Sequence, residues 1–195
     1  MKADSGIFCL QKRKLLKIKK QTEIICYFQS AKSVYQKKIS QKGKIKKVLA
    51  TKERGGIKLI VLADKSFLIA AVDKRNINHK IAAAYLNKNT GLTYVIPFSV
   101  IPEVCDFINL NISKEVEILF LKEVVKNFHI ELIENNDIER ATEIFERYAS
   151  LEINFSDAVF TAISERLKTN NILTFNTGSY DKMMPLGFKK FNMLV

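Results

Sequence analysis

Apolar and polar residues along positions 58–195 are arranged in segments that predict strands separated by helices. The predicted strand KLIVLA, residues 58–63, contains the short continuous apolar run LIVLA, which is typical of a parallel strand covered on both faces. The segment SFLIAAV that follows is predicted to be a short helix, and the polar turn DKRNIN ends it. Further strands are predicted at TYVIP, HIELIE, ILTF and, near the end of the chain, FKKFNML.

The segments between these strands carry apolar residues at helical spacing. One helix is predicted to begin after Asn78 and to end at Gly91, and another to follow Ser99 with Pro102 in its first turn. Three further helices are predicted to start at Ser113, Asp137 and Ser156. Strands that alternate with helices predict a three-layer α/β/α domain, an α/β fold around a mostly parallel sheet.

Charge divides the chain into two parts. Residues 1–58 contain 17 Lys and Arg against 3 acidic residues, whereas the remainder contains 15 against 17. We therefore expect a lysine-rich extension over residues 1–57, bounded by Gly55 and Gly56, and a folded domain over residues 58–195. Aromatic residues among the lysines suit stacking and phosphate contacts with a single-stranded nucleic acid, and a solvated tail is the simpler alternative.

Several classes of protein are disfavoured by the composition. The three cysteines, Cys9, Cys26 and Cys105, are widely separated, which argues against a zinc site or a disulfide framework and suits a reducing cytoplasm. No apolar run approaches the roughly 20 residues of a membrane helix, so we expect no membrane partner. The sequence also lacks the GxxxxGK[ST] and GxGxxG loops that bind nucleotides.

Acidic residues recur where predicted strands end or predicted helices begin. Asp64 follows the first strand, Glu103 and Asp157 lie in first turns of helices, and Asn176 ends the strand ILTF. Because the carboxyl ends of parallel strands meet at one edge of a sheet, we expect these side chains to converge there. Clustered carboxylates repel unless a divalent cation neutralises them, and their oxygens suit Mg²⁺ or Mn²⁺.

Each of these acids also has a purely structural alternative. Asp64 could simply cap the helix that follows it, and Asp157 could complement a helix dipole. Glu103 could be a solvated helix acid. Convergence in space therefore has to decide between the two interpretations.

Four segments, in this order, resemble a PIN domain of the VapC type: VLADKSFLIAAVDKRNINHKIAAAYL, VIPFSVIPEVCDFI, INFSDAVFTAISERL and ILTFNTGSYDKM. The resemblance covers about residues 58–188. It implies a metal-dependent ribonuclease fold in which Asp64, Glu103 and Asp157 bind the metal, with Ser66 as a helper beside them. Ser66 has the simpler alternative of a helix cap.

The chain departs from the family at Asn176, where members usually carry an aspartate. Asparagine keeps a carbonyl oxygen but removes a negative charge, so we expect weaker metal binding or the loss of a second metal. Asp181 lies five residues further on and is a candidate to compensate, with an exposed turn residue as the alternative.

The sequence thus predicts a Mg²⁺-dependent endoribonuclease in which Lys65, Lys74 and Arg75 hold the RNA backbone, a solvated loop being the alternative role for these three residues. Family resemblance further implies a toxin with a small antitoxin protein as partner, and a homodimer. The alternative function is a nuclease-derived RNA-binding protein that no longer cuts, which Asn176 and the basic extension favour.

Overall fold

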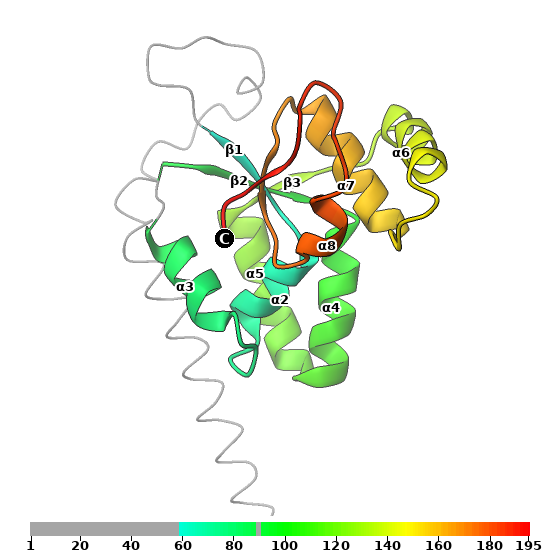
Figure 1. Cartoon of the computed structure of the whole chain (residues 1–195). Helices are drawn as coiled ribbons and strands as arrows, with labels where there is room; N and C mark the ends of the chain where they lie inside the picture. The colour runs from blue at the N-terminus through cyan, green and yellow to red at the C-terminus, as the bar shows by residue number, and fades with distance from the viewer. Residues whose placement is uncertain (1–58, 89–90) are drawn as a thin grey trace, which may run out of the picture. The chain divides into compact units, whose positions relative to one another are not determined.

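The computed structural model describes residues 59–88 and 91–195, and its helices and strands carry the labels of Figure 1. The predicted basic extension over residues 1–57, with its order and its nucleic-acid binding, lies outside the described residues. Within the described part of the chain, no helix is both long and apolar enough to cross a membrane.

Five parallel strands form one sheet in the order β3-β2-β1-β4-β5. Their bounds are β1 Ile60–Ala63, β2 Thr93–Pro97, β3 His129–Glu131, β4 Asn171–Leu173 and β5 Asn192–Met193. Leu62 in the central strand β1 pairs with Val95 of β2 and with Ile172 of β4. Val61, Leu62 and Ala63 are fully buried, as the continuous apolar run predicts for a strand covered on both faces.

The helices lie between successive strands. Between β1 and β2 lie α2 Lys65–Val72 and α3 His79–Lys88, and between β2 and β3 lie α4 Val100–Asn111 and α5 Lys114–Asn127. Between β3 and β4 lie α6 Asn135–Arg147 and α7 Phe155–Arg166, and between β4 and β5 lies α8 Thr177–Tyr180. The short helix α8 is absent from the sequence prediction. A single turn carries too few residues to show a helical period.

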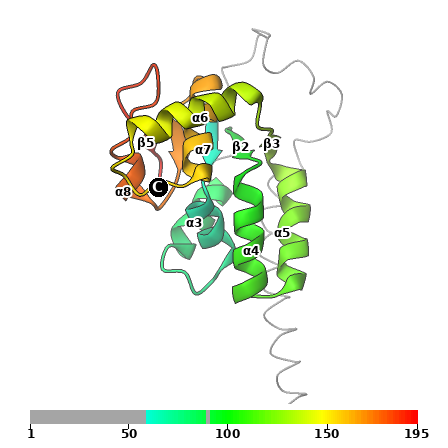
Figure 2. The ribbon, with the colours of Figure 1, turned by 90° about the vertical axis from the view of Figure 1, so that its right-hand side faces the viewer.

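The order of the strands explains the layers. From β1 the chain moves outward through β2 to β3, and then returns to β4 and β5 on the other side of β1. Right-handed connections therefore place α2 to α5 on one face of the sheet and α6 and α7 on the other. α4 packs against α2 and α5, whereas α6 packs along α7, as Figures 1 and 2 show. The predicted three-layer α/β/α fold is confirmed.

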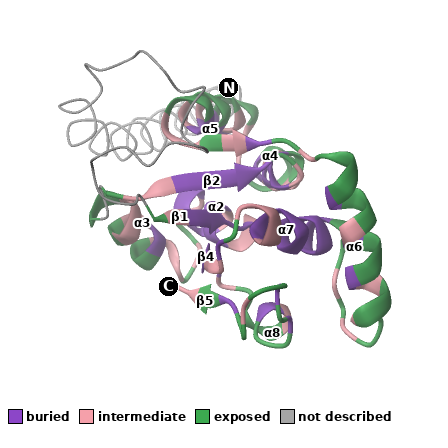
Figure 3. Ribbon diagram, turned by 90° about the horizontal axis from the view of Figure 1, so that it is seen from above, coloured by how far each residue is buried: buried purple, intermediate pink, exposed green. Residues whose placement is uncertain are grey.

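Burial follows the same plan. The strands β1, β2 and β4 and the helix α7 are mostly buried, whereas α6 presents an exposed outer side, as Figure 3 shows. The edge strands are shorter than predicted: β3 has 3 residues and β5 has 2. Both lie at an edge of the sheet, where only one neighbouring strand is available to pair.

Two predicted helix starts are wrong by a few residues. α6 begins at Asn135 rather than after Asp137, and α7 begins at Phe155 rather than after Ser156. In α6 the carboxylate of Asp137 occupies the third helical position and accepts a hydrogen bond of 2.9 Å from the backbone N–H of Glu134. An acidic side chain at the third helical position bonds back to the N-cap residue. An acid near a helix start can therefore be the third helical residue rather than the N-cap, which is why the predicted start lies too late.

Ser99 occupies the position before α4 as predicted, but its side chain does not cap the helix. Its Oγ is buried and has no hydrogen-bond partner. Capping is superfluous here because Pro102, the third helical residue, has no N–H to satisfy. The N–H of Ile101, the second residue, already donates to the carbonyl of Phe98 at 3.2 Å.

Candidate active site

The site begins at the carboxyl end of β1, where the chain reverses its direction across the sheet. β1 lies between β2, the next strand in sequence, and β4, to which the chain returns. Such a switch point leaves a crevice outside the strand ends, because the two connections depart to opposite sides. Asp64 is the first residue after β1 and is only 4% exposed.

Asp64 is held by donors from its own helix and from β4. Its Oδ2 accepts hydrogen bonds from the N–H of Ser66 at 3.2 Å, from Ser66 Oγ at 2.7 Å and from Thr174 Oγ1 at 2.9 Å. The backbone N–H of Phe175 donates in turn to Ser66 Oγ at 2.8 Å. Asp64 therefore caps α2 through Oδ2, as its structural alternative predicts. Its other carboxylate oxygen, Oδ1, takes part in none of these three hydrogen bonds.

Asp157 is positioned by the first turn of α7. The N–H of Asn154 donates to Asp157 Oδ2 at 3.1 Å, and the N–H of Asp157 donates to Asn154 Oδ1 at 2.9 Å. This reciprocal capping box fixes the carboxylate at the helix N-terminus. Burial raises the pKa of the Asp157 carboxyl above its ordinary value; the hydrogen bond from Asn154 opposes this, and repulsion from Asp64 adds to it.

Tyr180 joins these two acids, and the sequence analysis did not identify it. Its hydroxyl lies 3.5 Å from Asp64 Oδ1 and 3.3 Å from Asp157 Oδ1, so both remaining oxygens face one point. The ring is fully buried against Phe160 and Phe191. Burial and the two carboxylates raise the pKa of Tyr180 well above its usual value, which keeps the hydroxyl protonated as a donor.

Glu103 reaches the group through Lys65. Lys65 Nζ donates to Glu103 Oε2 at 2.5 Å, and about a third of each side chain is exposed (33% and 31%). Partial burial disfavours the charge of Lys65, but attraction to Glu103, Asp157 and Asp64 outweighs it and raises the lysine pKa. Glu103 is therefore neither a solvated helix acid nor bonded directly to the other two acids.

Two other predicted residues are not joined to this group. The side chains of Asn176 and Asp181 are exposed, and within the described residues neither makes a recorded hydrogen bond to Asp64, Glu103 or Asp157. Asn176 is linked only through its backbone, because its N–H donates to Thr174 Oγ1 at 3.0 Å. The catalytic role predicted for Asn176, and compensation by Asp181, remain predictions.

Lys74 and Arg75 lie at the far end of α2 from the acids. The acids surround the first turn of α2, whereas these two residues follow its last turn, roughly 12 Å away for a helix of 8 residues. Arg75 forms an ion pair of 2.9 Å with Asp73 and also donates to the carbonyl of Asn111 at 3.1 Å. Of the three predicted RNA contacts, only Lys65 lies within the acidic group.

The chemistry of these donors suits a hard divalent cation. Asp64 and Asp157 present one oxygen each to the same point, and Glu103 is a third acid nearby. In the described ranges, however, no three acidic, histidine or cysteine side chains are grouped closely enough to hold a metal ion as they stand. Glu103 is the one of these three acids that forms an ion pair with Lys65.

Comparisons with known proteins show which family the chain resembles. The family model described as the PIN domain matches residues 61–183, which include every residue of the acidic group. The chain is 22% identical over 135 residues to ribonuclease VapC26 of Mycobacterium tuberculosis (strain ATCC 25618 / H37Rv). That alignment covers 69% of this chain and 99% of the relative.

Solved structures show the same fold at low sequence identity. The Mycobacterium tuberculosis toxin VapC20, described as cleaving the sarcin-ricin loop, has a TM-score of 0.58 and 17% identity, over 65% of this chain and 98% of its own. VapBC2 from Rickettsia felis, bound to a promoter DNA fragment, has a TM-score of 0.51 and 16% identity, over 64% and 93%. A toxin–antitoxin complex from Klebsiella pneumoniae has a TM-score of 0.50 and 19% identity, over 63% and 92%.

Proposed function

Because the chain belongs to the PIN domain family, we propose that it is a metal-dependent endoribonuclease that hydrolyses phosphodiester bonds in single-stranded RNA. The observation that carries the proposal is the convergence of Asp64 and Asp157 on one point at the switch of the sheet, with Glu103 nearby. These acids belong to three elements far apart in sequence, so their meeting is a product of the fold.

Asp64, Asp157 and Glu103 are the residues that would hold Mg²⁺ or Mn²⁺. An ion of this kind supplies an activated water and offsets the charge that develops on the phosphate. Ser66 and Thr174 orient Asp64, and Asn154 orients Asp157, so neither carboxylate has to be reoriented when substrate arrives. Such preorganised charges lower the barrier because little reorganisation accompanies the reaction.

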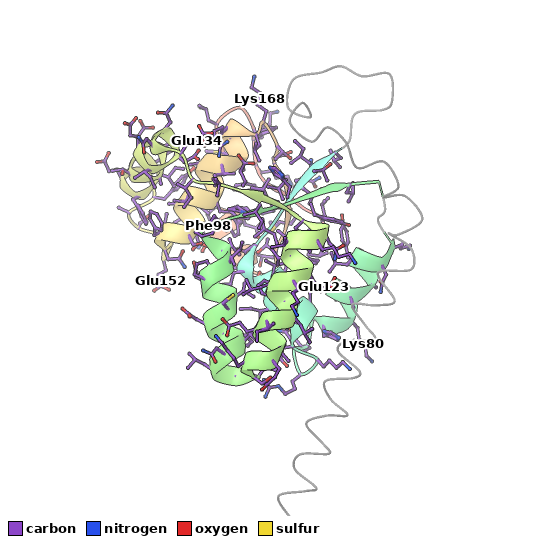
Figure 4. All side chains as sticks on the ribbon, turned by 180° about the vertical axis from the view of Figure 1, so that it is seen from behind. Lys80, Phe98, Glu123, Glu134, Glu152 and Lys168 are labelled. Atoms are coloured by element: carbon purple, nitrogen blue, oxygen red, sulfur yellow. The ribbon has the colours of Figure 1, made fainter. Side chains whose placement is uncertain are left out.

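Two exposed phenylalanines are suited to hold the RNA bases. Phe98 lies two residues before α4, which carries Glu103, and Phe155 opens α7, which carries Asp157. They are 49% and 50% exposed, and Figure 4 labels Phe98 at the start of α4. Aromatic faces bind successive bases by stacking without sequence preference. We assign them to the substrate surface together with Lys65, in preference to Lys74 and Arg75.

Replacement of either central acid tests the proposal. Asp64→Asn and Asp157→Asn should each reduce Mg²⁺-dependent cleavage of a labelled single-stranded RNA by roughly 100-fold or more, which is typical of losing one charge-stabilising group. Asp106→Asn, at an exposed position of α4, is the matched control and should cleave like the wild type. Cooperative melting of all three variants establishes that they fold. Wild-type cleavage by both central variants would contradict the assignment.

A second function is favoured by Asn176, which stands where members of the family usually carry an aspartate. An RNA-binding protein that has lost most of its cleavage activity would retain the fold and carry a neutral residue such as Asn176. The variant Asn176→Asp separates the two functions. A sharp rise in cleavage identifies a weakened nuclease, whereas unchanged RNA binding without any cleavage identifies a binding protein.

We also propose a small antitoxin protein as partner, which would cover the acidic group and block RNA. This is supported by similarity to the Klebsiella pneumoniae toxin–antitoxin complex and to VapBC2. Inhibition of cleavage by the product of an adjacent short gene is the measurement that checks it. The homodimer remains a prediction, to be checked by the mass of the purified protein in solution.

A further inference from the structure

Lys65 stands in the middle of the acidic group. It is the first residue of α2, directly between the two residues that form the capped turn, Asp64 and Ser66. Its ammonium bonds to Glu103 at 2.5 Å and interacts favourably with Asp157 and Asp64 as well. The single ammonium group of Lys65 therefore interacts with all three acids to which we assign the metal.

Three arginines in the described part of the chain pair with acids away from the site. Arg75 pairs with Asp73, Arg140 with Glu165, and Arg166 with Glu131 and Asp137. Lys65, by contrast, interacts with all three acids of the site. Because it supplies a single charge to three carboxylates, the group retains an excess of negative charge that can still attract a divalent ion.

The ammonium of Lys65 and a divalent ion compete for the same oxygens. Glu103 Oε2 already accepts a short hydrogen bond from Lys65, so a metal ion that binds this oxygen has to share it with a neighbouring positive charge. Both species are positive, so each raises the electrostatic cost of the other when they are a few ångström apart.

We propose that Lys65 is a built-in counter-ion of the acidic site and sets its affinity for divalent metal, because the ion binds fully only when the ammonium leaves Glu103. The inference rests on the proposed metal-dependent function and deepens it. Lys65 balances the acids of the metal-free protein, and once displaced it is available to the RNA phosphate. Together with the neutral Asn176, it makes this a site of weak metal affinity.

Calorimetric titration with Mn²⁺ at pH 7 tests the proposal without any activity assay. Lys65→Met removes the charge and keeps an unbranched side chain, and should raise Mn²⁺ affinity by about tenfold or more, which is the repulsion between a unit charge and a divalent ion a few ångström apart even in water. Lys65→Arg keeps the charge and should bind like the wild type. Lys122→Met, at an exposed position of α5, is the matched control and should also bind like the wild type.

A double-mutant cycle distinguishes competition from a general charge effect. Glu103→Gln should weaken Mn²⁺ binding more in the Lys65→Met background than in the wild type, where Glu103 is already engaged. Should Lys65→Met fail to fold, Lys65→Gln gives the same comparison. Equal Mn²⁺ affinity in the wild type and the neutral variants would overturn the inference and leave the proposed metal site intact. Absence of Mn²⁺ binding in every variant would overturn both.

Discussion

Asp157 uses its two carboxylate oxygens for different purposes. Oδ2 accepts the N–H of Asn154 and stabilises the start of α7, while Oδ1 faces the hydroxyl of Tyr180 and the carboxylate of Asp64. The structural alternative for this residue is therefore correct as far as one oxygen is concerned. It does not explain the other oxygen, which lies beside a second buried carboxylate at a cost in stability.

This cost predicts a pH-dependent gain from Asp157→Asn in the metal-free protein. Burial and Asp64 raise the pKa of Asp157 above its ordinary value of 3.8, so the native state binds this proton more tightly than the unfolded state. The wild type therefore loses folding stability as the pH rises through the raised pKa of Asp157, and the neutral asparagine variant does not lose it. Its unfolding free energy should exceed that of the wild type at pH 7, with a difference that shrinks toward pH 4.

Urea unfolding in EDTA at several pH values measures this difference, with Asp106→Asn as the exposed control. A variant that is less stable than the wild type by the same amount at every pH would mean that capping, and not charge, dominates at this position. Added Mn²⁺ should reverse the order, because a ligand present at 100 times its Kd stabilises the native wild type by about 2.7 kcal/mol. The variant lacks one of the acids that hold the ion.

Tyr180 shows the limit of residue-level inference. In the sequence it follows Gly178 and Ser179 within a polar stretch, and nothing in its spacing points to the acids. Its position is set by Phe160 of α7 and by Phe191, which precedes β5. A tyrosine whose ring is buried needs a partner for its hydroxyl, and here packing supplies two carboxylates.

At the scale of elements, the first turn of α7 determines where an acid of the site points. Asn154 closes the capping box from outside the helix. Its side chain satisfies a backbone N–H that would otherwise have no partner, and its own N–H holds Asp157. A short polar residue before a helix therefore has consequences for the site as well as for stability.

Asn154→Ala should lower the unfolding free energy by about 1 kcal/mol, the usual cost of losing an N-cap side chain. Asn154→Ser is the matched control, because serine caps about as well as asparagine and should restore most of the loss. Chemical denaturation measures both. An alanine variant as stable as the wild type would show that the capping interaction contributes nothing at this helix.

At the scale of the whole molecule, one arginine ties α7 to α6 and to the edge strand β3. Arg166 Nη1 lies 2.7 Å from Glu131 Oε1, and its Nε lies 2.9 Å from Asp137 Oδ1. Both acids are buried, so they depend on this one guanidinium for much of their compensation. The contact joins three consecutive elements of the chain, and it ties the helices α6 and α7 to the edge of the sheet.

Arg166→Met should therefore destabilise the fold by about 2 kcal/mol, somewhat less than for a fully buried pair because the guanidinium is partly exposed. Arg147→Met, at an exposed position near the end of α6, should change stability by about 0.5 kcal/mol or less. Denaturant midpoints of the two variants provide the comparison. Equal effects would mean that solvent screens the Arg166 network as it screens a surface ion pair.

The sequence by itself determined the layers and the carboxyl-edge location of Asp64. Continuous apolar runs identify buried parallel strands, alternation with helical periods identifies the α/β class, and an acid at the end of a buried strand has few places to go. Those signals are local, because they depend on which residues lie within one element. They located β1, β2, β4 and the main helices to within a few residues.

Only the tertiary structure decided which side chains meet. Glu103 and Lys65 are 38 positions apart and Tyr180 and Asp64 are 116 apart, and no local period relates them. Their contacts follow from the strand order, which brings β4 next to β1, and from the packing of aromatic rings that aims the Tyr180 hydroxyl at two carboxylates. Proximity across a sheet is a property of the folded chain, because it is set by every connection at once.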